Sequence, residues 1–269
     1  MNLLTKIEQI KLRDEIVHIY FLGQSGYVFK TNQTILYIDP YLTNYVEHPD
    51  GLNEKSMRRN FNPPISPSDI QKLDAVLCTH SHGDHMDPWT IQQINTEFIF
   101  YSSIGAYEKS PVEIAPEKMT FLEPNKPEFI NDIKIDPIHA AHYELYDKNG
   151  RPDCLSFIIS CHNKTFFFWG DGILYEGLEQ KLQPFTFDYF FAPVNGRDKE
   201  RENMGIIGNI NGKELAELCC NLNVKSLVPN HIDMFKNNSA SISSFLDGMN
   251  DICPSQSVIV MNCGDKIEV

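Results

Sequence analysis

Apolar residues in this chain gather in short runs that polar and glycine-containing turns separate. Three early runs, 16–22, 27–30 and 34–38, are rich in β-branched and aromatic residues and predict an antiparallel meander of three strands. The segment 41–67, which follows Asp39-Pro40, is rich in Asn, Pro and charge and therefore predicts a long connection. A connection of this length inside a compact domain is typical of a functional lid or a mobile segment.

The rest of the chain alternates between strand-like and helix-like segments. Strands are predicted at 74–79, 98–101, 129–138, 155–160, 165–169, 188–192, 226–228 and 257–261, with an edge strand at the C-terminus. Helical segments are predicted at 69–73, 87–94, 102–109, 173–181, 212–222 and 241–249. Asp87 and Pro88 suit the N-cap and the first position of their helix. We therefore predict an α+β protein with two sheets packed together and helices outside them, as a single domain over residues 1–269.

Composition and charge narrow the class of protein. The chain has 269 residues, of which 42% are hydrophobic, as in ordinary globular proteins. Its formal charge of −13 repels phosphate backbones, so nucleic acid is not expected as a partner. The seven cysteines include no C-x-x-C pair, the N-terminus is too polar for a signal peptide, and no apolar run is long enough to span a membrane. We expect a cytoplasmic protein with reduced thiols and no membrane partner.

The segment 79–85 reads Thr-His-Ser-His-Gly-Asp-His and holds three of the 9 histidines of the chain. Imidazole and carboxylate groups are the usual ligands of zinc and similar divalent ions. In a loop that doubles back, residues two apart can face one ion, and Asp84 and His85 can face a second. The alternative is a polar surface loop with scattered histidines, which such a dense cluster disfavours.

Further candidate ligands follow later strands. His139 and His142 come after the strand that ends at 138, Asp171 lies in a Trp-Gly-Asp-Gly sequence after the 165–169 strand, and His231 follows the 226–228 strand. A polar residue at a strand end is often only a cap or a turn residue. Catalytic residues also collect there, and the ordered set favours a metal site.

The H-x-H-x-D-H loop, followed by a His, an Asp and a His, resembles the metallo-β-lactamase fold superfamily. The similarity is greatest to the UlaG-like hydrolases, the branch that contains L-ascorbate-6-phosphate lactonase. Segments 73–80, 169–171 and 228–233 carry this finer resemblance, which extends from about residue 16 to the C-terminus. The lactonase is longer at both ends, so its substrate does not transfer with the fold.

The resemblance implies an αββα sandwich of two packed mixed β-sheets with helices on the outer faces, and a dinuclear metal centre. The implied ligands are His80, His82 and His142 for one ion, Asp84, His85 and His231 for the other, and Asp171 as the bridge. His139 competes with His142 for its position. No Cys falls at a ligand position, so manganese or iron is as plausible as zinc.

Such a centre predicts a hydrolase in which a hydroxide that bridges two divalent ions attacks an electrophilic carbon or phosphorus. The resemblance favours a lactone or ester of a small anionic metabolite, phosphorylated and sugar-like in its sharpest form. Asp84 is predicted to be a ligand and, as a hypothesis, to shuttle a proton to the leaving group. A phosphodiesterase on the same fold and a non-catalytic metal-binding or ligand-sensing protein are the alternatives.

A few polar residues in the long loops are candidates for substrate binding. They are Arg58, Asn195, Arg197 and Asp233. Solvated loop charges are the more common role for such an Arg. Asp39, at the end of a strand, is expected either to orient the metal-site histidines or to form a plain turn. Self-association into a homo-oligomer stays open.

Overall fold

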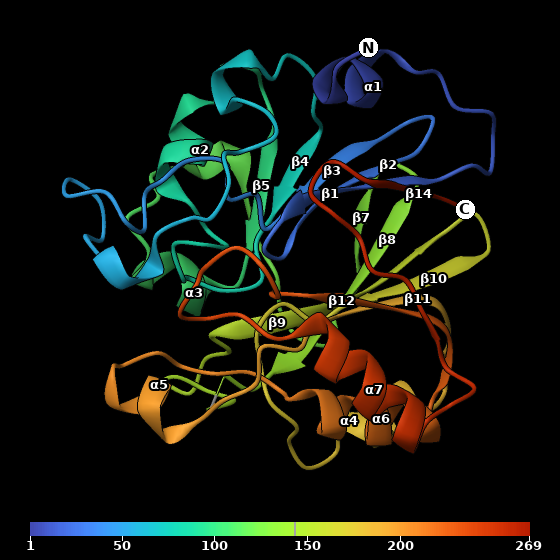
Figure 1. Cartoon of the computed structure of the whole chain (residues 1–269). Helices are drawn as coiled ribbons and strands as arrows, with labels where there is room; N and C mark the ends of the chain where they lie inside the picture. Colours follow the sequence, from blue (N-terminus) through green and yellow to red (C-terminus); the bar gives the residue numbers. More distant parts are fainter. Residues whose placement is uncertain (143) are drawn as a thin grey trace.

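Two β-sheets lie face to face in the computed structural model, which describes residues 1–142 and 144–269 (Figure 1). The first sheet contains, in spatial order, β14 (Lys266–Glu268), β1 (His18–Gly23), β2 (Gly26–Lys30), β3 (Ile35–Ile38), β4 (Ala75–Leu77), β5 (Ile99–Ser102) and β6 (Met119–Phe121). The second contains β13 (Ser257–Val258), β12 (Asn223–Asn230), β11 (Thr186–Pro193), β10 (Lys164–Phe168), β9 (Cys154–Cys161), β8 (Ile133–Ala140) and β7 (Glu128–Ile130).

Each sheet joins antiparallel strands to parallel ones. In the first sheet, β1, β2 and β3 form the antiparallel meander expected from the sequence, and β3 to β6 run parallel. In the second, β7 to β10 are antiparallel and β10 to β13 are parallel. β14 pairs with β1 as the C-terminal edge strand. The prediction of two packed mixed sheets is confirmed.

Helices cover the outer face of each sheet. The helices α1 (Leu3–Gln9), α2 (Pro88–Gln93) and α3 (Ile104–Lys109) pack on the first sheet, and α4 (Leu178–Leu182), α6 (Gly212–Asn221) and α7 (Ile242–Ile252) pack on the second. The short α5 (Lys199–Asn203) lies in the loop that precedes α6. Three 3₁₀ turns are found at Lys55–Met57, Pro67–Asp69 and Pro116–Lys118. Among the described residues, no helix has the length and apolar character needed to cross a membrane.

An aromatic layer fills the space between the sheets. The rings of Phe168 and Phe191 stack with centroids 4.3 Å apart, and Phe29 meets Phe166 edge-on at 4.8 Å. Each of these side chains is at most 3% exposed. Burying a side chain of this size contributes roughly 1.5–3 kcal/mol, so this layer provides a rigid base for the loops at the sheet ends.

The long connection 41–67 packs on the segment that follows β12. Tyr41, Tyr45 and Val46 are buried against Met234 and Phe235. The amide of residue 60 also donates to the carbonyl of residue 234 at 2.8 Å. Its role as a lid stays a prediction.

Asp87 fastens this connection to α2. Its carboxylate accepts the amide of Trp89 at 3.0 Å as N-cap, and it accepts the hydroxyl groups of Thr90 and Thr43 at 2.6 and 2.7 Å. The predicted N-cap role is therefore confirmed, with Pro88 at the first helical position. The bond to Thr43 is an addition that only the fold reveals.

Several predicted elements need correction. The run 129–138 is not one strand but the hairpin of β7 and β8, because Asn131 takes a left-handed conformation (φ 52°) in the turn between them. The predicted helix 173–181 begins only at Leu178, because Gly177 (φ 91°) interrupts it and Ile173 pairs with Ala141. The turn predicted at 69–73 lies at 67–69, and α1, α5 and β6 were not predicted.

Candidate metal centre

Loops from both sheets meet at the ends of the strands that carry the candidate ligands. The loop 79–85 follows β4 in the first sheet. In the second sheet, β8, β10 and β12 point the same way, because β9 is antiparallel to both β8 and β10 while β10, β11 and β12 are parallel. Their C-terminal ends therefore share one edge of the sheet, where His142, Asp171 and His231 follow.

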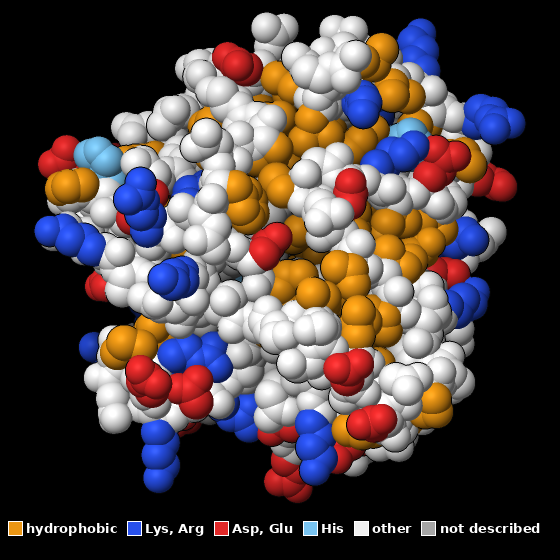
Figure 2. Space-filling model, viewed as in Figure 1, with side chains coloured by type: hydrophobic (Ala, Val, Ile, Leu, Met, Phe, Trp, Pro, Cys, Tyr) orange, Lys and Arg blue, Asp and Glu red, His pale blue; other side chains and the backbone are white. Residues whose placement is uncertain are grey.

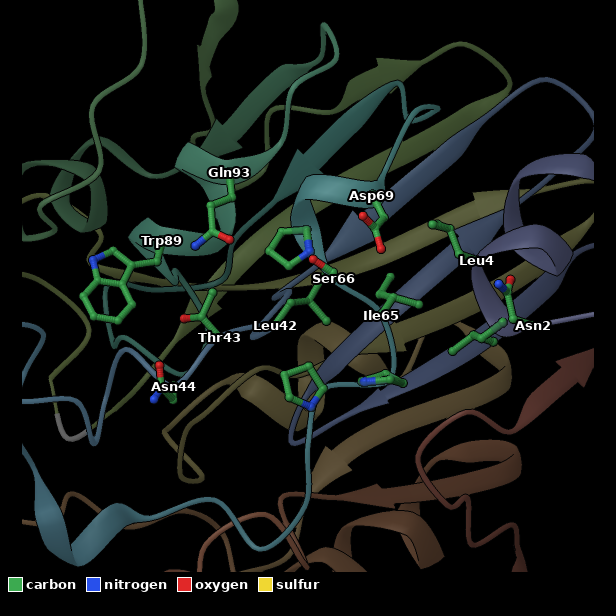
Figure 3. A pocket seen from close by; sticks show the side chains of 14 residues that line it. Asn2, Leu4, Leu42, Thr43, Asn44, Ile65, Ser66, Asp69, Trp89 and Gln93 are labelled. Atoms are coloured by element: carbon green, nitrogen blue, oxygen red, sulfur yellow. The ribbon is translucent and has the colours of Figure 1, made fainter.

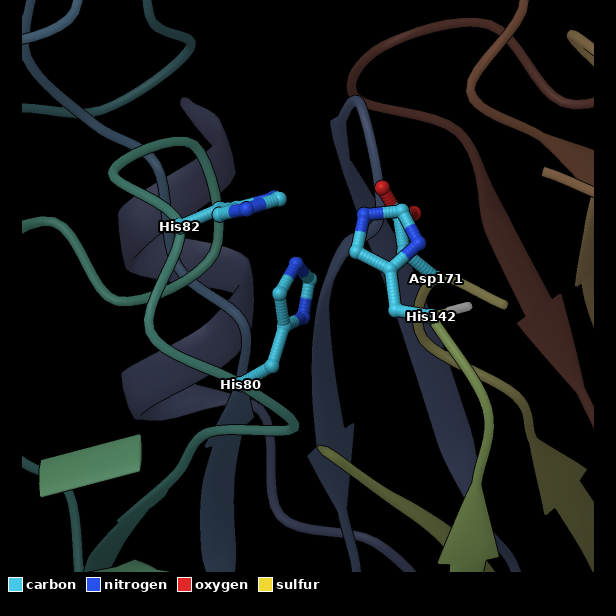
Figure 4. Close-up of side chains that lie close together, drawn as sticks. All are labelled: His80, His82, His142 and Asp171. Atoms are coloured by element: carbon cyan, nitrogen blue, oxygen red, sulfur yellow. The ribbon is translucent and has the colours of Figure 1, made fainter. Parts of the chain in front are cut away.

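The first cluster consists mainly of imidazoles. The ligand atoms of His80, His82, His142 and Asp171 all lie within 4.8 Å of one another. Figure 4 shows these side chains converging on a shared space. His82 and His142 are partly exposed, whereas His80 and Asp171 are buried, so solvent reaches this cluster from the side of His82 and His142. We call His80, His82 and His142 the histidine half of the centre.

The second cluster is buried. The ligand atoms of Asp84, His85 and His231 lie within 4.8 Å of one another, and all three residues are buried. We call them the carboxylate half. Asp171 contacts this half as well, since its Oδ1 is 3.3 Å from Nε2 of His85 and its Oδ2 is 3.3 Å from Nε2 of His231. Asp171 thus lies between the two halves, as expected of a bridging ligand.

Asp39 and Thr79 orient two of the imidazoles. The Nδ1–H of His85 donates to Oδ2 of Asp39 at 2.7 Å, and the Thr79 hydroxyl donates to the same oxygen at 2.7 Å. Because its proton is used there, the Thr79 oxygen accepts the Nδ1–H of His80 at 3.0 Å. Outer contacts of this kind fix ligand orientation in metal sites. The structure supports the orienting role of Asp39 over a plain turn.

Glycine permits close packing around the histidine loop. Gly170 has φ 71°, and a Cβ there would lie 2.7 Å from the Thr79 side chain. A Cβ at Gly83 would lie 2.9 Å from Leu52 and 3.0 Å from the ring of Tyr45. These positions let β10 and the long connection approach the loop directly.

Gln24 contacts the carboxylate half and was not predicted from the sequence. It lies in the two-residue turn between β1 and β2, and it is fully buried. Its Nε2 is 2.7 Å from Oδ2 of Asp84 and 2.8 Å from Nε2 of His231. Glutamine is an uncommon metal ligand and stands in no His/Asp pattern, so only the β1–β2 turn geometry reveals it.

The histidine half holds neutral imidazoles. Burial lowers the pKa values of all three, and the nearby imidazoles lower that of His80 further. The pKa of His142 falls to about 4, with Asp171 opposing the shift. Neutral imidazole is the form that binds metal, so this half is ready for a cation near neutral pH.

The carboxylate half has the opposite electrostatics. Burial lowers the pKa values of His85 and His231, but Asp171 and Asp84 outweigh it, so that of His85 rises well above its usual range and that of His231 rises to about 9. Burial likewise raises the pKa values of Asp84 and Asp171, and the two imidazoles reverse this and hold both low. Positive charge is therefore favoured between these side chains.

The residues of the centre fit divalent cations. Nε2 of His80 is buried and makes no hydrogen bond, and Nε2 of His85 and Oδ1 of Asp171 are buried and lie 3.3 Å apart without hydrogen-bond geometry. A buried polar atom without a partner costs about 1–3 kcal/mol, so an accumulation of them needs an explanation. Imidazole nitrogen and carboxylate oxygen are donors that zinc, manganese and iron accept.

The structure places His142, but not His139, among the candidate ligands. His142 joins the histidine half, whereas His139 lies in β8 with its Nε2 3.4 Å from the Tyr146 hydroxyl. The arrangement favours His142 as the ligand. The assignment of each ligand to an ion stays a proposal.

Two of the predicted substrate-binding residues support loops. The Nδ2 of Asn195 donates to Asn238 at 2.7 Å, and its Oδ1 accepts from Asn209 at 2.9 Å, which in turn accepts the amide of Gly172 at 2.8 Å. This chain of amides ties the loop at 195 to the residue after Asp171. Arg197 binds Glu214 through both terminal nitrogens, at 2.8 and 2.6 Å. Substrate contact by either residue stays a prediction.

Arg58 and Asp233 have freer surroundings. Arg58 is exposed, and its Nε is 3.8 Å from a carboxylate oxygen of Glu47. Asp233 is half-buried, its Oδ1 makes no hydrogen bond, and burial raises its pKa. Both remain candidates for substrate contact.

A separate groove lies away from the centre. Figure 3 shows this space of about 640 Å³ between the N-terminal segment, residues 42–44 and the proline-containing segment 63–67. Its lining includes one carboxylate, Asp69, and no His or Cys. It therefore lacks the donors of the metal centre.

Comparison with known proteins gives a consistent result. Residues 34–232 match the family model described as the beta-lactamase superfamily domain. A UPF0173 metal-dependent hydrolase from Pyrococcus abyssi is 24% identical over 263 residues, covering 94% of this chain and 100% of that protein.

Solved structures of similar fold agree. The metallo-beta-lactamase fold protein YhfI from Bacillus subtilis superposes with a TM-score of 0.68 at 15% identity, over 96% of this chain and 100% of that chain. Igni18, a metallo hydrolase from Ignicoccus hospitalis, gives a TM-score of 0.67 at 19% identity, over 94% and 98% of the two chains. At these identities the likeness concerns the fold.

Proposed function

Because the chain belongs to the beta-lactamase superfamily, as a metal-dependent hydrolase, we propose that it binds two divalent ions and hydrolyses a lactone or ester of a small anionic metabolite. The single observation that carries the proposal is the position of Asp171, which contacts both halves of the centre. A carboxylate with this position suits a pair of ions better than one.

The residues that would hold the ions follow from the two clusters. His80, His82 and His142 would hold one ion, Asp84, His85 and His231 the other, and Asp171 both. Bound there, two divalent ions lower the pKa of water and stabilise the negative charge that develops on a substrate. Manganese, zinc and iron all suit this donor set.

The protein residues divide the remaining tasks. Asp39 and Thr79 hold the imidazoles of His85 and His80 in place. Substrate enters from the side of His82 and His142, since these ligands are the partly exposed ones. As a hypothesis, Asp84, whose Oδ2 lies 3.6 Å from Nε2 of His231, would also take up a proton and pass it to the leaving group.

The role of Asp84 can be tested separately. Asp84→Asn should weaken metal binding, and once metal is restored by excess it should also change the pH dependence of kcat. A variant that regains metal and keeps the wild-type pH–rate profile would show that Asp84 is a ligand only.

The substrate class rests on resemblance and charge. The UlaG-like sequence segments favour a small phosphorylated or otherwise anionic lactone or ester, and exposed Arg58 offers a cation on the loop 41–67. On the face that Figure 2 shows, Lys and Arg side chains are dispersed among acidic ones. With a net charge of −13, this distribution supports a small molecule rather than nucleic acid as partner. A cytoplasmic location and self-association remain predictions.

The proposal is tested by metal content and a substrate panel. Elemental mass spectrometry of protein purified without chelator should give about two ions per chain, and fewer for Asp171→Ala. The loaded protein is then assayed with aryl esters, sugar lactones, their phosphorylated forms and bis(p-nitrophenyl) phosphate. Metal-dependent cleavage of lactones or esters supports the proposal.

Other outcomes select the alternatives. Cleavage of the phosphodiester alone would identify a phosphodiesterase. Two bound ions without turnover of any substrate would favour a non-catalytic metal-binding or ligand-sensing protein. One ion or none, even with excess manganese, iron or zinc, would overturn the dinuclear mechanism.

A further inference from the structure

The turn between β1 and β2 places a neutral amide inside the carboxylate half. Gln24 is fully buried, and its side chain reaches two of the three members of that half. Gln24 also holds His231 through the backbone, because the Gln24 carbonyl accepts the amide of His231 at 3.0 Å. Gln24 and His231 are thus fixed to each other by both main chain and side chain.

The backbone at Gln24 is unusual for this residue type. Its φ of 56° lies in the left-handed region, which Gly and Asn adopt far more readily than Gln. Strain of this kind persists where the surroundings enforce it, and it gathers at functional sites. The strained turn directs the Gln24 side chain into the centre.

The amide end of Gln24 is only half satisfied. Its Nε2 faces Asp84 and His231, while its Oε1 is buried and makes no hydrogen bond. The two ends of an amide have nearly the same shape, so either can face the same neighbours. The nitrogen end suits an anion, and the oxygen end suits a cation held between Asp84 and His231.

We propose that Gln24 is a ligand of the metal ion in the carboxylate half and supplies its amide oxygen. The inference rests on the proposed binding of two ions. Amide oxygen is a hard, neutral donor. It therefore favours manganese or ferrous iron over the softer metals that thiolates bind, and it adds no charge to the site. The other interpretation is that Gln24 only donates a hydrogen bond that positions Asp84.

Three variants separate these interpretations. Gln24→Met keeps the length of the side chain and removes the amide. Gln24→Asn suits the left-handed turn but shortens the reach by one methylene, so it guards against a folding defect. Gln24→Glu keeps an oxygen donor and removes the N–H donors. Ser25→Ala, in the same turn, is the matched control, because Ser25 contacts Asn230 at 3.4 Å rather than a candidate ligand.

The measurement is calorimetric titration of the metal-free protein with Mn²⁺, with melting curves of each metal-free variant. We call the ion in the histidine half the first and the ion in the carboxylate half the second. We expect Gln24→Met and Gln24→Asn to weaken binding of the second ion at least tenfold and to leave binding of the first unchanged. Gln24→Glu should bind the second ion as tightly as wild type or more tightly, and Ser25→Ala should match wild type.

Two results would overturn the inference while the proposed function stands. In one, wild type and Gln24→Met bind the second ion equally well. In the other, Gln24→Glu weakens it as much as Gln24→Met does, which would show that the N–H donor matters. If wild type itself takes up no second ion, the inference and the dinuclear function both fail.

Discussion

The two halves of the candidate metal centre differ in exposure and in charge. The histidine half is open to solvent at His82 and His142, and burial keeps its imidazoles neutral. The carboxylate half is enclosed, and although burial acts to lower the pKa values of His85 and His231, these values are raised because carboxylates surround both imidazoles. Burial alone therefore does not set the protonation of a ligand; the neighbouring charges decide it.

This difference suggests separate roles. The open, neutral half can take up an ion without releasing a proton and can meet a substrate. The enclosed half must exchange protons for its ion, and the carboxylates of Asp84 and Asp171 beside its two imidazoles favour a cation that is shielded from solvent. Substitutions at Asp171, Asp39 and Thr79, and changes of pH, should therefore affect metal binding in the two halves to different extents.

The largest effect is expected at Asp171, the residue shared by both halves. Asp171→Ala should remove at least one ion per chain and lower activity by more than about a hundredfold, beyond the 10–100-fold typical for residues that only support ligands. Metal analysis and initial rates on the same preparations measure this. Loss confined to one half, with the other at full occupancy and activity, would show that Asp171 does not connect them.

Asp39→Asn should affect mainly the carboxylate half. Asp39 accepts the Nδ1–H of His85 directly, and it has φ 43°, a conformation that Asn tolerates, so the backbone should keep its path. We expect the affinity of that half for Mn²⁺ to fall about 10–100-fold.

The control for Asp39→Asn is Asp188→Asn. Asp188 is also a largely buried carboxylate, but it binds Lys225 at 2.8 Å and the amide of Thr165 at 2.9 Å in the second sheet. Its replacement should leave metal affinity unchanged. If both variants weaken metal binding equally, general destabilisation is the cause.

The pH dependence of metal binding should also differ between the halves. His231 has a pKa of about 9 in the metal-free protein, so below that pH a cation must displace its proton. Affinity of the carboxylate half should rise about tenfold per pH unit for each proton released as pH increases toward 9. The histidine half, with His142 at a pKa of about 4, should be nearly independent of pH above 6.

Calorimetric titrations with Mn²⁺ at about pH 6.5, 7.5 and 8.5 check this prediction. Buffers of different ionisation enthalpy give the number of protons released with each ion. Parallel pH dependence of the two binding steps would contradict the contrast between the halves.

The smallest effect is expected at Thr79. Thr79→Val removes the hydroxyl that accepts from His80 and donates to Asp39 while keeping the side-chain volume. The loss of one such hydrogen bond amounts to about 1 kcal/mol, or roughly fivefold in the affinity of the histidine half. A change as large as that of Asp39→Asn would indicate that the two residues act as one unit.

The sequence allowed much of the architecture to be predicted, and the errors have physical causes. Strands with clear apolar runs were placed within a few residues, and the Asp87 cap followed from its chemistry. The hairpin of β7 and β8 was missed because Asn131 and Asp132 lie inside a segment in which polar residues recur between apolar ones, so they did not stand out as a turn. The start of α4 was misplaced because Gly177 was not weighed as an interruption.

The candidate site was likewise predicted only in part. The loop 79–85 was recognised because it holds three histidines, and the other His and Asp candidates were predicted from their place after strands and from the family resemblance. Gln24 was not found, because amides are common in turns and its partners Asp84 and His231 are 60 and 207 positions away in the sequence. Asn195 and Arg197 were predicted to bind substrate, which stays a prediction, and their bonds to Asn238 and Glu214 could not be foreseen because they depend on loop packing.

The sequence by itself determined the two-sheet architecture and the histidine loop 79–85, because apolar periodicity and the spacing within one short loop are local properties of the chain. The other candidate ligands were predicted from their place after strands and from the family resemblance. The tertiary structure brings His142 and not His139 into the centre and places Asp171 between its halves, as the resemblance implied, and it alone decided that one half is open while the other is enclosed. These properties depend on which strand ends become neighbours and on the charges that then surround each imidazole, and no local pattern encodes them.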